Sequence, residues 1–296
     1  MSNTYWSTYF QFTEELYKSR ALRFRDDNAG QWLNLLQCEE GNKILEVGCG
    51  GGIFCHRIKK HLKDAEVTGI DLDSGHIDYA KDKSKELNLD CRFLAGDATN
   101  LPFENNSFDI VFSHTVASFC EPNAFIYEQK RVLKSGGKCL ILFAVNHDKR
   151  IEDWVPDDSC EEKSLFDKIW SEAEKNQISN IKNYETEISN YFKLLEKFEF
   201  KNVMLDTLSA VQYCPDSANV NEELAISQIN EERLSELCSV HKARNLAPTA
   251  LTDSEFDLMI KMINRRFDKR INEYKHGIKK WDWRVGTVIA ISGVKK

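Results

Sequence analysis

The stretch ILEVGCGGG (44–52) decides the fold, because it joins an apolar run to an amphipathic one through a string of glycines. The run KILEV (43–47) is typical of a buried strand, and IFCHRIKKHL (53–62) is typical of a helix. Glycines at such a junction let the backbone approach a ligand without a Cβ in the way. The unpaired N–H groups at the start of the following helix favour a polar or anionic group. A ligand site is therefore expected at this turn.

Strand and helix patterns continue to alternate after this turn. We expect strands at 43–47, 66–71, 91–96, 108–113 and 138–145, and helices at 53–62, 74–87 and 124–133, the last stopped by SGG (135–137). Strands that alternate with helices imply right-handed crossovers and a parallel sheet that is buried on both faces. The fold class is therefore α/β.

The acidic residues near the turn indicate the kind of ligand. Asp71 ends the second expected strand, where a carboxylate can accept both hydroxyls of a ribose. The dinucleotide fingerprint G-x-G-x-x-G fails, because its last position, counted from Gly48, falls on Ile53. Glu46 would repel a pyrophosphate but attract a cationic amino group. These residues favour a nucleoside with an amino group and disfavour a nicotinamide-dependent oxidoreductase.

Four segments resemble the class I S-adenosylmethionine-dependent methyltransferases. They are ILEVGCGGG (44–52), GIDLDSGHIDYA (69–80), GDATNLPFENNSFDIVFS (96–113) and RVLKSGGKCLILF (131–143). The resemblance covers about 100 residues in the family's order and spacing. It implies S-adenosylmethionine as the cofactor and methyl transfer to a small molecule as the activity. The adenine-base methyltransferases are disfavoured, because their Asn/Asp-Pro-Pro-aromatic motif is replaced here by SHTV (113–116).

The resemblance also implies roles for individual residues. The implied cofactor-binding residues are Glu46, Gly48, Cys49, Gly50, Gly52, Asp71, Leu72, Asp97, Ala98, Ser113 and His114. Among them Asp71 would bind the ribose, Leu72 would lie against the adenine, and Asp97 would accept from its amino group. His114 is the best-placed candidate base, followed by His147, which comes after the fifth expected strand. Both also have an ordinary interpretation as structural histidines, and no metal site is expected.

The family pattern implies a Rossmann-like, doubly wound, seven-stranded, mostly parallel sheet with an antiparallel last strand and a helical cap. We expect six segments: an N-terminal helical lid (1–42), a cofactor-binding core (43–145), an acidic helical insertion (146–187), a core helix and sixth strand (188–212), a helical cap insertion (213–284) and the last strand (285–296). The acidic insertion contains twelve acidic and six basic residues. A charged segment of this kind is usually a solvated face, although it could pack on the basic side of the helix expected at 254–275.

The N-terminal segment is a candidate lid over the cofactor. It contains the aromatic residues Tyr5, Trp6, Tyr9, Phe10, Phe12 and Tyr17, followed by Arg20, Arg23 and Arg25. An aromatic ring could attract the sulfonium of the cofactor, and an arginine could bind its carboxylate. A helix packed on the core with solvated arginines is the simpler alternative.

The composition of the chain limits the kinds of binding partner and the location that we expect. The chain has 296 residues and a net charge of −7, which is unusual for a protein that binds nucleic acid along phosphate backbones. No apolar run reaches the roughly 18–20 residues that span a membrane, and the start lacks a secretory signal. Nine cysteines without a CxxC pair suggest free thiols and a cytoplasmic protein. Oligomeric state is left open.

Two alternatives to a small-molecule methyltransferase are also considered. One is an S-adenosylmethionine-binding protein without catalysis, and the other is a methyltransferase acting on RNA or protein.

Overall fold

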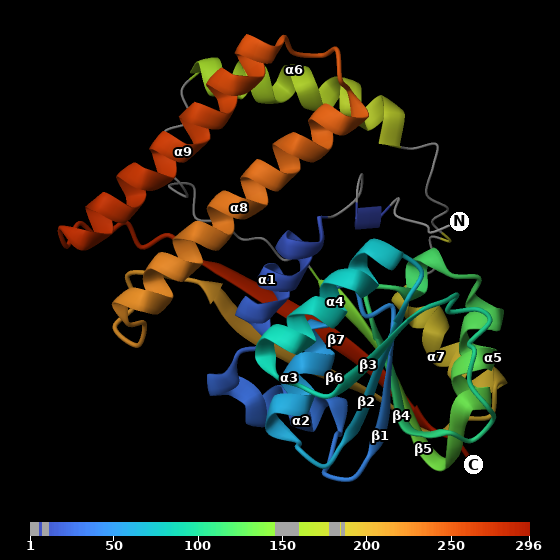
Figure 1. The fold of residues 1–296 in the computed structure, drawn as a ribbon. Coiled ribbons are helices and arrows are strands. Elements are labelled where there is room, and N and C mark those ends of the chain that lie inside the picture. The colour runs from blue at the N-terminus through green and yellow to red at the C-terminus, as the bar shows by residue number, and fades with distance from the viewer. Residues whose placement is uncertain (1–5, 8–11, 146–159, 178–183, 185–186) are drawn as a thin grey trace.

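The computed structural model describes residues 6–7, 12–145, 160–177, 184 and 187–296. Its centre is a seven-stranded sheet in the order β3-β2-β1-β4-β5-β7-β6 (Figure 1). The strands are β1 (Lys43–Val47), β2 (Glu66–Asp71), β3 (Cys91–Ala95), β4 (Phe108–His114), β5 (Leu133–Val145), β6 (Lys201–Tyr213) and β7 (Arg284–Val294). The first five run parallel, whereas β7 is antiparallel to both β5 and β6. The expected mostly parallel sheet with an antiparallel last strand is confirmed.

Helices cover both faces of this sheet. The helices are α1 (Thr13–Arg23), α2 (Ala29–Leu36), α3 (Ile53–His61), α4 (Ser74–Leu87), α5 (Pro122–Val132), α6 (Cys160–Gln177), α7 (Ile188–Lys197), α8 (Glu222–Leu246) and α9 (Asp253–Lys275), with short 3-10 turns η2 (Asp26–Asn28) and η3 (Ala117–Phe119). In Figure 1, α2, α3 and α4 lie on one side of the sheet, and α5 and α7 on the other. None of these described helices is long and apolar enough to cross a membrane.

The alternation of side chains along each strand creates two cores. Ile44 belongs to the core under α2 and α3, while its neighbour Leu45 belongs to the core under α5 and α7. Successive residues of a strand point to opposite faces, and both faces are covered, so both residues are fully buried. The continuous apolar run KILEV is the consequence.

Helices α6, α8 and α9 form a cap with a core of its own, seen above the sheet in Figure 1. The acidic α6 packs on α9, where Arg266 pairs with Glu162 in a buried contact. A second buried network joins the cap to the sheet. There Arg270 of α9 pairs with Asp216, which follows β6, and with Asp282, which precedes β7, each at 2.8 Å.

Helix α5 starts and ends at other residues than the sequence predicted. The helix expected at 124–133 begins at Pro122, because the side chain of Glu121 accepts from two backbone N–H groups and caps it. It ends at Val132, three residues before the expected glycine stop. Leu133 already pairs with Phe108 of β4, so the glycines lie within an irregular stretch of β5.

Candidate active site

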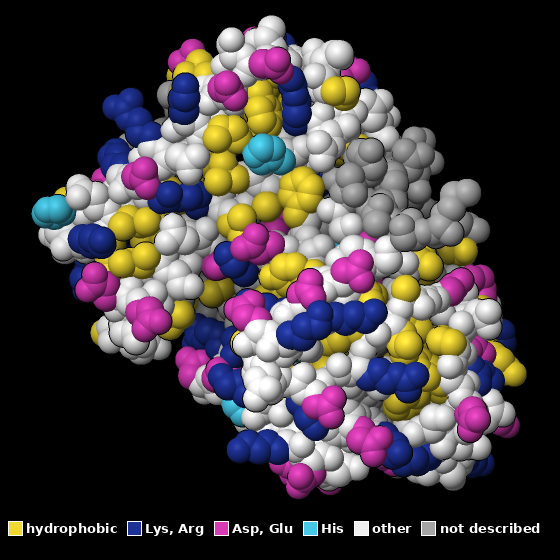
Figure 2. All heavy atoms as spheres, viewed as in Figure 1, with side chains coloured by type: hydrophobic (Ala, Val, Ile, Leu, Met, Phe, Trp, Pro, Cys, Tyr) yellow, Lys and Arg dark blue, Asp and Glu magenta, His cyan; other side chains and the backbone are white. Residues whose placement is uncertain are grey.

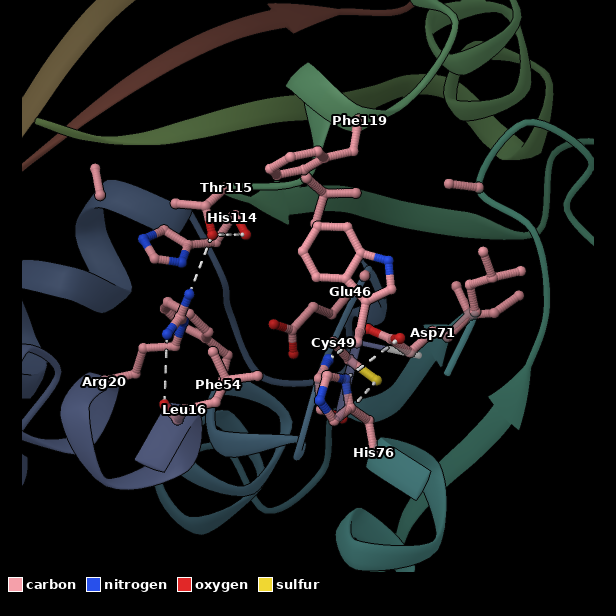
Figure 3. Close-up of a pocket in the computed structure, with 18 of the residues that line it drawn as sticks. Leu16, Arg20, Glu46, Cys49, Phe54, Asp71, His76, His114, Thr115 and Phe119 are labelled. Atoms are coloured by element: carbon pink, nitrogen blue, oxygen red, sulfur yellow. Dashed lines mark hydrogen bonds and ion pairs between the residues drawn. The ribbon is translucent and has the colours of Figure 1, made fainter. Parts of the chain in front are cut away.

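A pocket of about 970 Å³ lies at the carboxyl ends of β1, β2 and β4, beneath α1. Its walls come from all parts of the chain, including Ser235 of α8 and Arg284 of β7. In Figure 3, one side of the pocket carries Arg20, His114 and Thr115, and the other carries Cys49, Asp71 and His76. Glu46 lies between the two groups. Ligands of open α/β sheets bind at this edge, where the strand order reverses.

The glycine turn between β1 and α3 forms the floor of the pocket. Gly48 has a φ of 73°, which an L side chain rarely adopts, and its N–H donates to the Ile70 carbonyl at 2.7 Å. A Cβ at Gly48 would lie 2.2 Å from a methyl carbon of Val116. The glycine therefore allows the segment after β4 to approach the turn, and both Gly48 and Val116 line the pocket.

Asp71 holds the turn in place from the end of β2. One of its carboxylate oxygens accepts from the N–H of Gly50 at 2.8 Å, and the other accepts from the N–H of Asp73 at 2.9 Å. Each oxygen keeps a further lone pair for a ligand. Asp73 in turn caps α4 through the N–H groups of Gly75 and His76. The aspartate that the sequence assigned to the ribose thus lines the pocket with its orientation fixed by backbone donors.

Glu46 is the most perturbed carboxyl group of the pocket. Its side chain accepts from the thiol of Cys55 at 3.1 Å, and burial raises its pKa to about 8 despite that bond. Asp71 raises the pKa further, while Arg20 opposes the rise. Without a ligand, Glu46 is therefore largely protonated at neutral pH and would ionise if a cation came close.

The predicted adenine-binding residues lie together at the open side of the pocket. Leu72 is 49% exposed, although it is a large apolar residue, and it lines the pocket with Asp97 and Ala98. One oxygen of Asp97 accepts from the N–H and hydroxyl of Thr99. An exposed leucine beside a carboxylate suits a flat ring with an amino group.

His114 and Arg20 form the opposite side. His114 is buried against the rings of Phe24 and Phe54, and neither of its ring nitrogens has a hydrogen-bond partner within the part of the chain that the structure describes. Burial lowers its pKa well below the usual value, and the charges of Arg20 and Arg23 lower it further. Arg20 donates to the hydroxyl of Thr115 at 3.2 Å. A histidine in this setting is neutral at physiological pH.

Part of the N-terminal segment, for which a lid is predicted, lines the pocket. Trp6, Arg20 and Arg23 line it, and the ring of Trp6 meets that of Phe119 edge to face at 4.7 Å. Arg25 instead pairs with Asp27 away from the pocket. Tyr17 packs against Tyr79 and does not line the pocket. Tyr5, Tyr9 and Phe10 lie outside the described residues.

Most, but not all, of the predicted cofactor-binding residues line the pocket. Those that do are Glu46, Gly48, Cys49, Gly50, Asp71, Leu72, Asp97, Ala98 and His114. Gly52 instead is the N-cap residue of α3, with a φ of 81°, and a Cβ there would meet Phe93 at 2.7 Å. Ser113 is fully buried within β4. His147 lies outside the described residues.

Several lining residues were not singled out from the sequence. They include His76, Phe119, Cys120, Tyr184, Gln212, Ser235 and Arg284. The sequence could have indicated His76, because this residue follows the capping Asp73 at the start of a helix beside the pocket. Arg284 is the first residue of the last strand, where a charged residue can point into a site. Ser235 lies in the middle of α8 and carried no such signal.

Comparison with known proteins shows what the core is similar to. Residues 45–141 match the family model described as "Methyltransferase domain". The sheet order is that of the class I methyltransferase fold. A solved Haemonchus contortus phosphoethanolamine N-methyltransferase 2 in complex with S-adenosyl-L-methionine shares this fold, with a TM-score of 0.54 at 16% identity over 100% of this chain and 60% of the other.

Curated relatives match about a third of the chain. A Mycobacterium tuberculosis phthiotriol/phenolphthiotriol dimycocerosates methyltransferase is 40% identical over 99 residues, 33% of this chain and 36% of the relative. A Mycolicibacterium smegmatis fatty-acid O-methyltransferase is 36% identical over 102 residues, 33% of this chain and 35% of the relative. The chain thus spans about a third of the length of these relatives.

Proposed function

We propose that the protein is an S-adenosylmethionine-dependent methyltransferase that acts on a small-molecule or lipid acceptor. The observation that carries the proposal is the meeting of the glycine turn, Asp71 and Glu46 in one pocket of a methyltransferase domain. The curated relatives are named for methyl transfer to lipids and a fatty acid, which supports the acceptor class. The acceptor atom is left open.

The pocket residues fit the proposed cofactor. The two oxygens of Asp71 suit the ribose hydroxyls, and Leu72 with Asp97 suits the adenine. Glu46 suits the cationic amino group, because a cation lowers the pKa of a buried carboxyl group. A pocket of about 970 Å³ is at the large end of the range for ligand sites, which leaves room for an acceptor beside the cofactor.

The protein's own contribution would be binding and alignment. The cofactor supplies an activated methyl group and its own leaving group, so the chain has to hold the donor and bring the acceptor into line. Trp6, Phe119 and Leu16 cover the pocket and would keep water from the reacting atoms. Burial lowers the pKa of His114 well below its usual value, which makes it a weak base. We propose His114, and after it His147, as the candidate bases for an acceptor that must lose a proton, whereas an acceptor without such a proton needs neither.

The surface favours a small acceptor over a macromolecule. On the face shown in Figure 2, acidic and basic side chains are interspersed, and lysine and arginine do not form a continuous area. The pocket is also lined by α1 and α8, which would obstruct a bulky substrate. Both features argue against an RNA or protein substrate.

Binding without methyl transfer is the main alternative. A solved structure named as the [4+2]-cyclase SpnF shares the fold, with a TM-score of 0.50 at 16% identity over 91% of this chain and 80% of the other. The fold by itself therefore does not establish methyl transfer.

The test is transfer of a labelled methyl group from S-adenosylmethionine. The acceptor panel would contain fatty acids, hydroxylated lipids, amines and thiols, together with total RNA and an unfractionated protein extract. The proposal expects S-adenosylhomocysteine to form with at least one small molecule or lipid. Binding of the cofactor without transfer to any acceptor would favour the alternative, and labelling of RNA or protein alone would contradict the proposed acceptor class.

We also propose a cytoplasmic location. All nine cysteines are free thiols, and five of them are buried, which suits a reducing compartment. Recovery of the protein in an oxidising compartment with its thiols paired would contradict this.

A further inference from the structure

The side of the pocket opposite Asp71 gathers three arginines, Arg20 and Arg23 from α1 and Arg284 from β7. They are neighbours in space as well as lining the same cavity. A Cβ at Gly286 would lie 3.1 Å from Nε of Arg23. Position 284 projects from the same face of β7 as position 286, because side chains alternate along a strand. Figure 3 shows the Arg20 side chain directed toward His114 and Thr115 on this side.

The charges of these arginines are only partly neutralised by the protein. Arg284 pairs with Glu232, and Arg23 is bonded to the amide of Gln212, oriented with its oxygen toward the arginine at 2.9 Å from Nη2. Arg20 donates to the hydroxyl of Thr115 and to the carbonyl of Leu16. In the described part of the chain, no carboxylate lies within ion-pairing distance of Arg20. Burial and the charge of Arg23 lower its pKa to about 9, against the attraction of Glu46 and Glu15.

Unsatisfied hydrogen-bond donors point into the same region. Among the described residues, Nε of Arg284 is buried without a hydrogen-bond partner, and so are both ring nitrogens of the neutral His114, of which one is a donor and the other an acceptor. A buried donor without a partner costs about 1–3 kcal/mol, and native structures rarely leave such groups without protein, water or ligand to satisfy them. Two such donors, one on Arg284 and one on His114, lie beside the half-buried guanidinium of Arg20, which has no carboxylate partner in the described part of the chain. Together they indicate that this wall is completed by a ligand with acceptor oxygens and negative charge.

We infer that the acceptor carries an oxyanion, a carboxylate or a phosphate, which anchors it against Arg20, Arg284 and His114. This subsite rests on the proposed function, because only a bound methyl donor makes the adjoining space an acceptor site. The apolar residues Leu16, Phe54 and Val116 line the same pocket and would contact an apolar body attached to the anion. The cofactor's own carboxylate is the other possible source of negative charge here, and the experiment has to separate the two.

The test uses the full-length protein saturated with S-adenosylhomocysteine, which already fills any site for the cofactor's carboxylate. Hexanoate, hexyl phosphate, hexan-1-ol and hexylamine are then titrated by calorimetry. We expect hexanoate or hexyl phosphate to bind at least tenfold more tightly than hexan-1-ol and hexylamine, and the preferred anion identifies the headgroup. Equal binding of the neutral probe, no binding of either anion, or displacement of S-adenosylhomocysteine by them would overturn the inference.

Variants locate the subsite. Arg20→Gln and Arg284→Gln should weaken binding of the preferred anion at least tenfold and change the affinity for S-adenosylhomocysteine less than threefold. Arg57→Gln is the matched control, because Arg57 pairs with Asp26 and does not line the pocket. Thermal unfolding checks that each variant is folded, and Arg20→Gln should not destabilise the free protein because it removes an uncompensated charge. An equal loss of S-adenosylhomocysteine binding in both pocket variants would show that the arginines hold the cofactor instead. Failure of the unmodified protein to bind S-adenosylhomocysteine would refute the proposed function itself.

Discussion

The thiol of Cys55 lies 3.1 Å from the carboxyl group of Glu46, which lines the ligand pocket. A thiol is a weak donor, so this contact only partly offsets the burial of the carboxyl group. The result is an acid with a pKa of about 8 beside the expected position of a cationic ligand group.

The pH dependence of cofactor binding should report this acid. Below pH 8, Glu46 must lose a proton before it can pair with the cofactor's amino group, so the affinity for S-adenosylhomocysteine should rise between pH 6 and 8 and then level off. The rise is at most tenfold per pH unit, because one proton is released. Calorimetry from pH 6 to 9 measures this affinity. The Glu46→Gln variant should bind S-adenosylhomocysteine more weakly, and its affinity should not rise with pH. An unmodified protein whose affinity does not change with pH would contradict this role.

The same ionisation should affect folding of the ligand-free protein. The folded state keeps the Glu46 proton up to about pH 8, whereas an unfolded glutamate loses it near pH 4.5. Between pH 4.5 and about 8 the folded state therefore binds more protons than the unfolded state. The contribution of Glu46 to the free energy of unfolding falls as the pH rises through this range. Thermal unfolding should show Glu46→Gln to be more stable than the unmodified protein at pH 8, with the difference vanishing near pH 4.5. A difference that is the same at both pH values would point to packing instead.

The glycine turn can be tested against a matched glycine elsewhere. Gly48 and Gly41 have similar φ angles, 73° and 76°, but only a Cβ at Gly48 would meet another side chain, Val116. Gly48→Ala should lower the free energy of unfolding through both the strained backbone and the clash with Val116. Gly41→Ala should lower it through the backbone alone, by about 1–2 kcal/mol. Urea unfolding should show the larger loss for Gly48→Ala, and calorimetry should show loss of cofactor binding for this variant only. Equal effects of the two substitutions would refute the close approach.

The buried network of Arg270 should hold the cap to the sheet. Its guanidinium pairs with Asp216 and Asp282, and the hydroxyl of Tyr213 donates to Asp282 at 2.8 Å. Arg270→Met leaves two buried carboxylates unpaired and should lower the free energy of unfolding by about 3–5 kcal/mol. Arg265→Met on the exposed side of the same helix should change it by about 0.5 kcal/mol or less. Urea unfolding measures both changes. Similar losses of free energy of unfolding in the two variants would show that the network does not hold the cap to the sheet.

The sheet and the cofactor side of the pocket were predictable because local signals define them. The runs at 43–47 and 66–71 coincide with β1 and β2 to the residue, since apolar runs bounded by turn residues are strong signals. Asp71 and Glu46 were found because each stands at a strand end beside the glycines.

The arginine wall of the pocket was only partly predictable. Arg20 and Arg23 drew attention as a cluster after the N-terminal aromatic residues, but Gln212 and Arg284 come from strands that meet only in the folded sheet. One partner of Arg270 is similarly remote, because Asp216 lies 54 residues away from it in the sequence. Such contacts depend on how the cap is placed, and no local periodicity encodes that.

The most direct test of the account is the affinity for S-adenosylhomocysteine of the unmodified protein and of Asp71→Ala, measured by calorimetry, with Asp71→Asn to separate charge from shape. We expect one binding site per chain and a loss of roughly 1.5–3 kcal/mol in Asp71→Ala, the value of a hydrogen-bonded charged group. Equal affinity in the two proteins would contradict the placement of the ribose, and no binding to the unmodified protein would contradict the assignment as a methyltransferase.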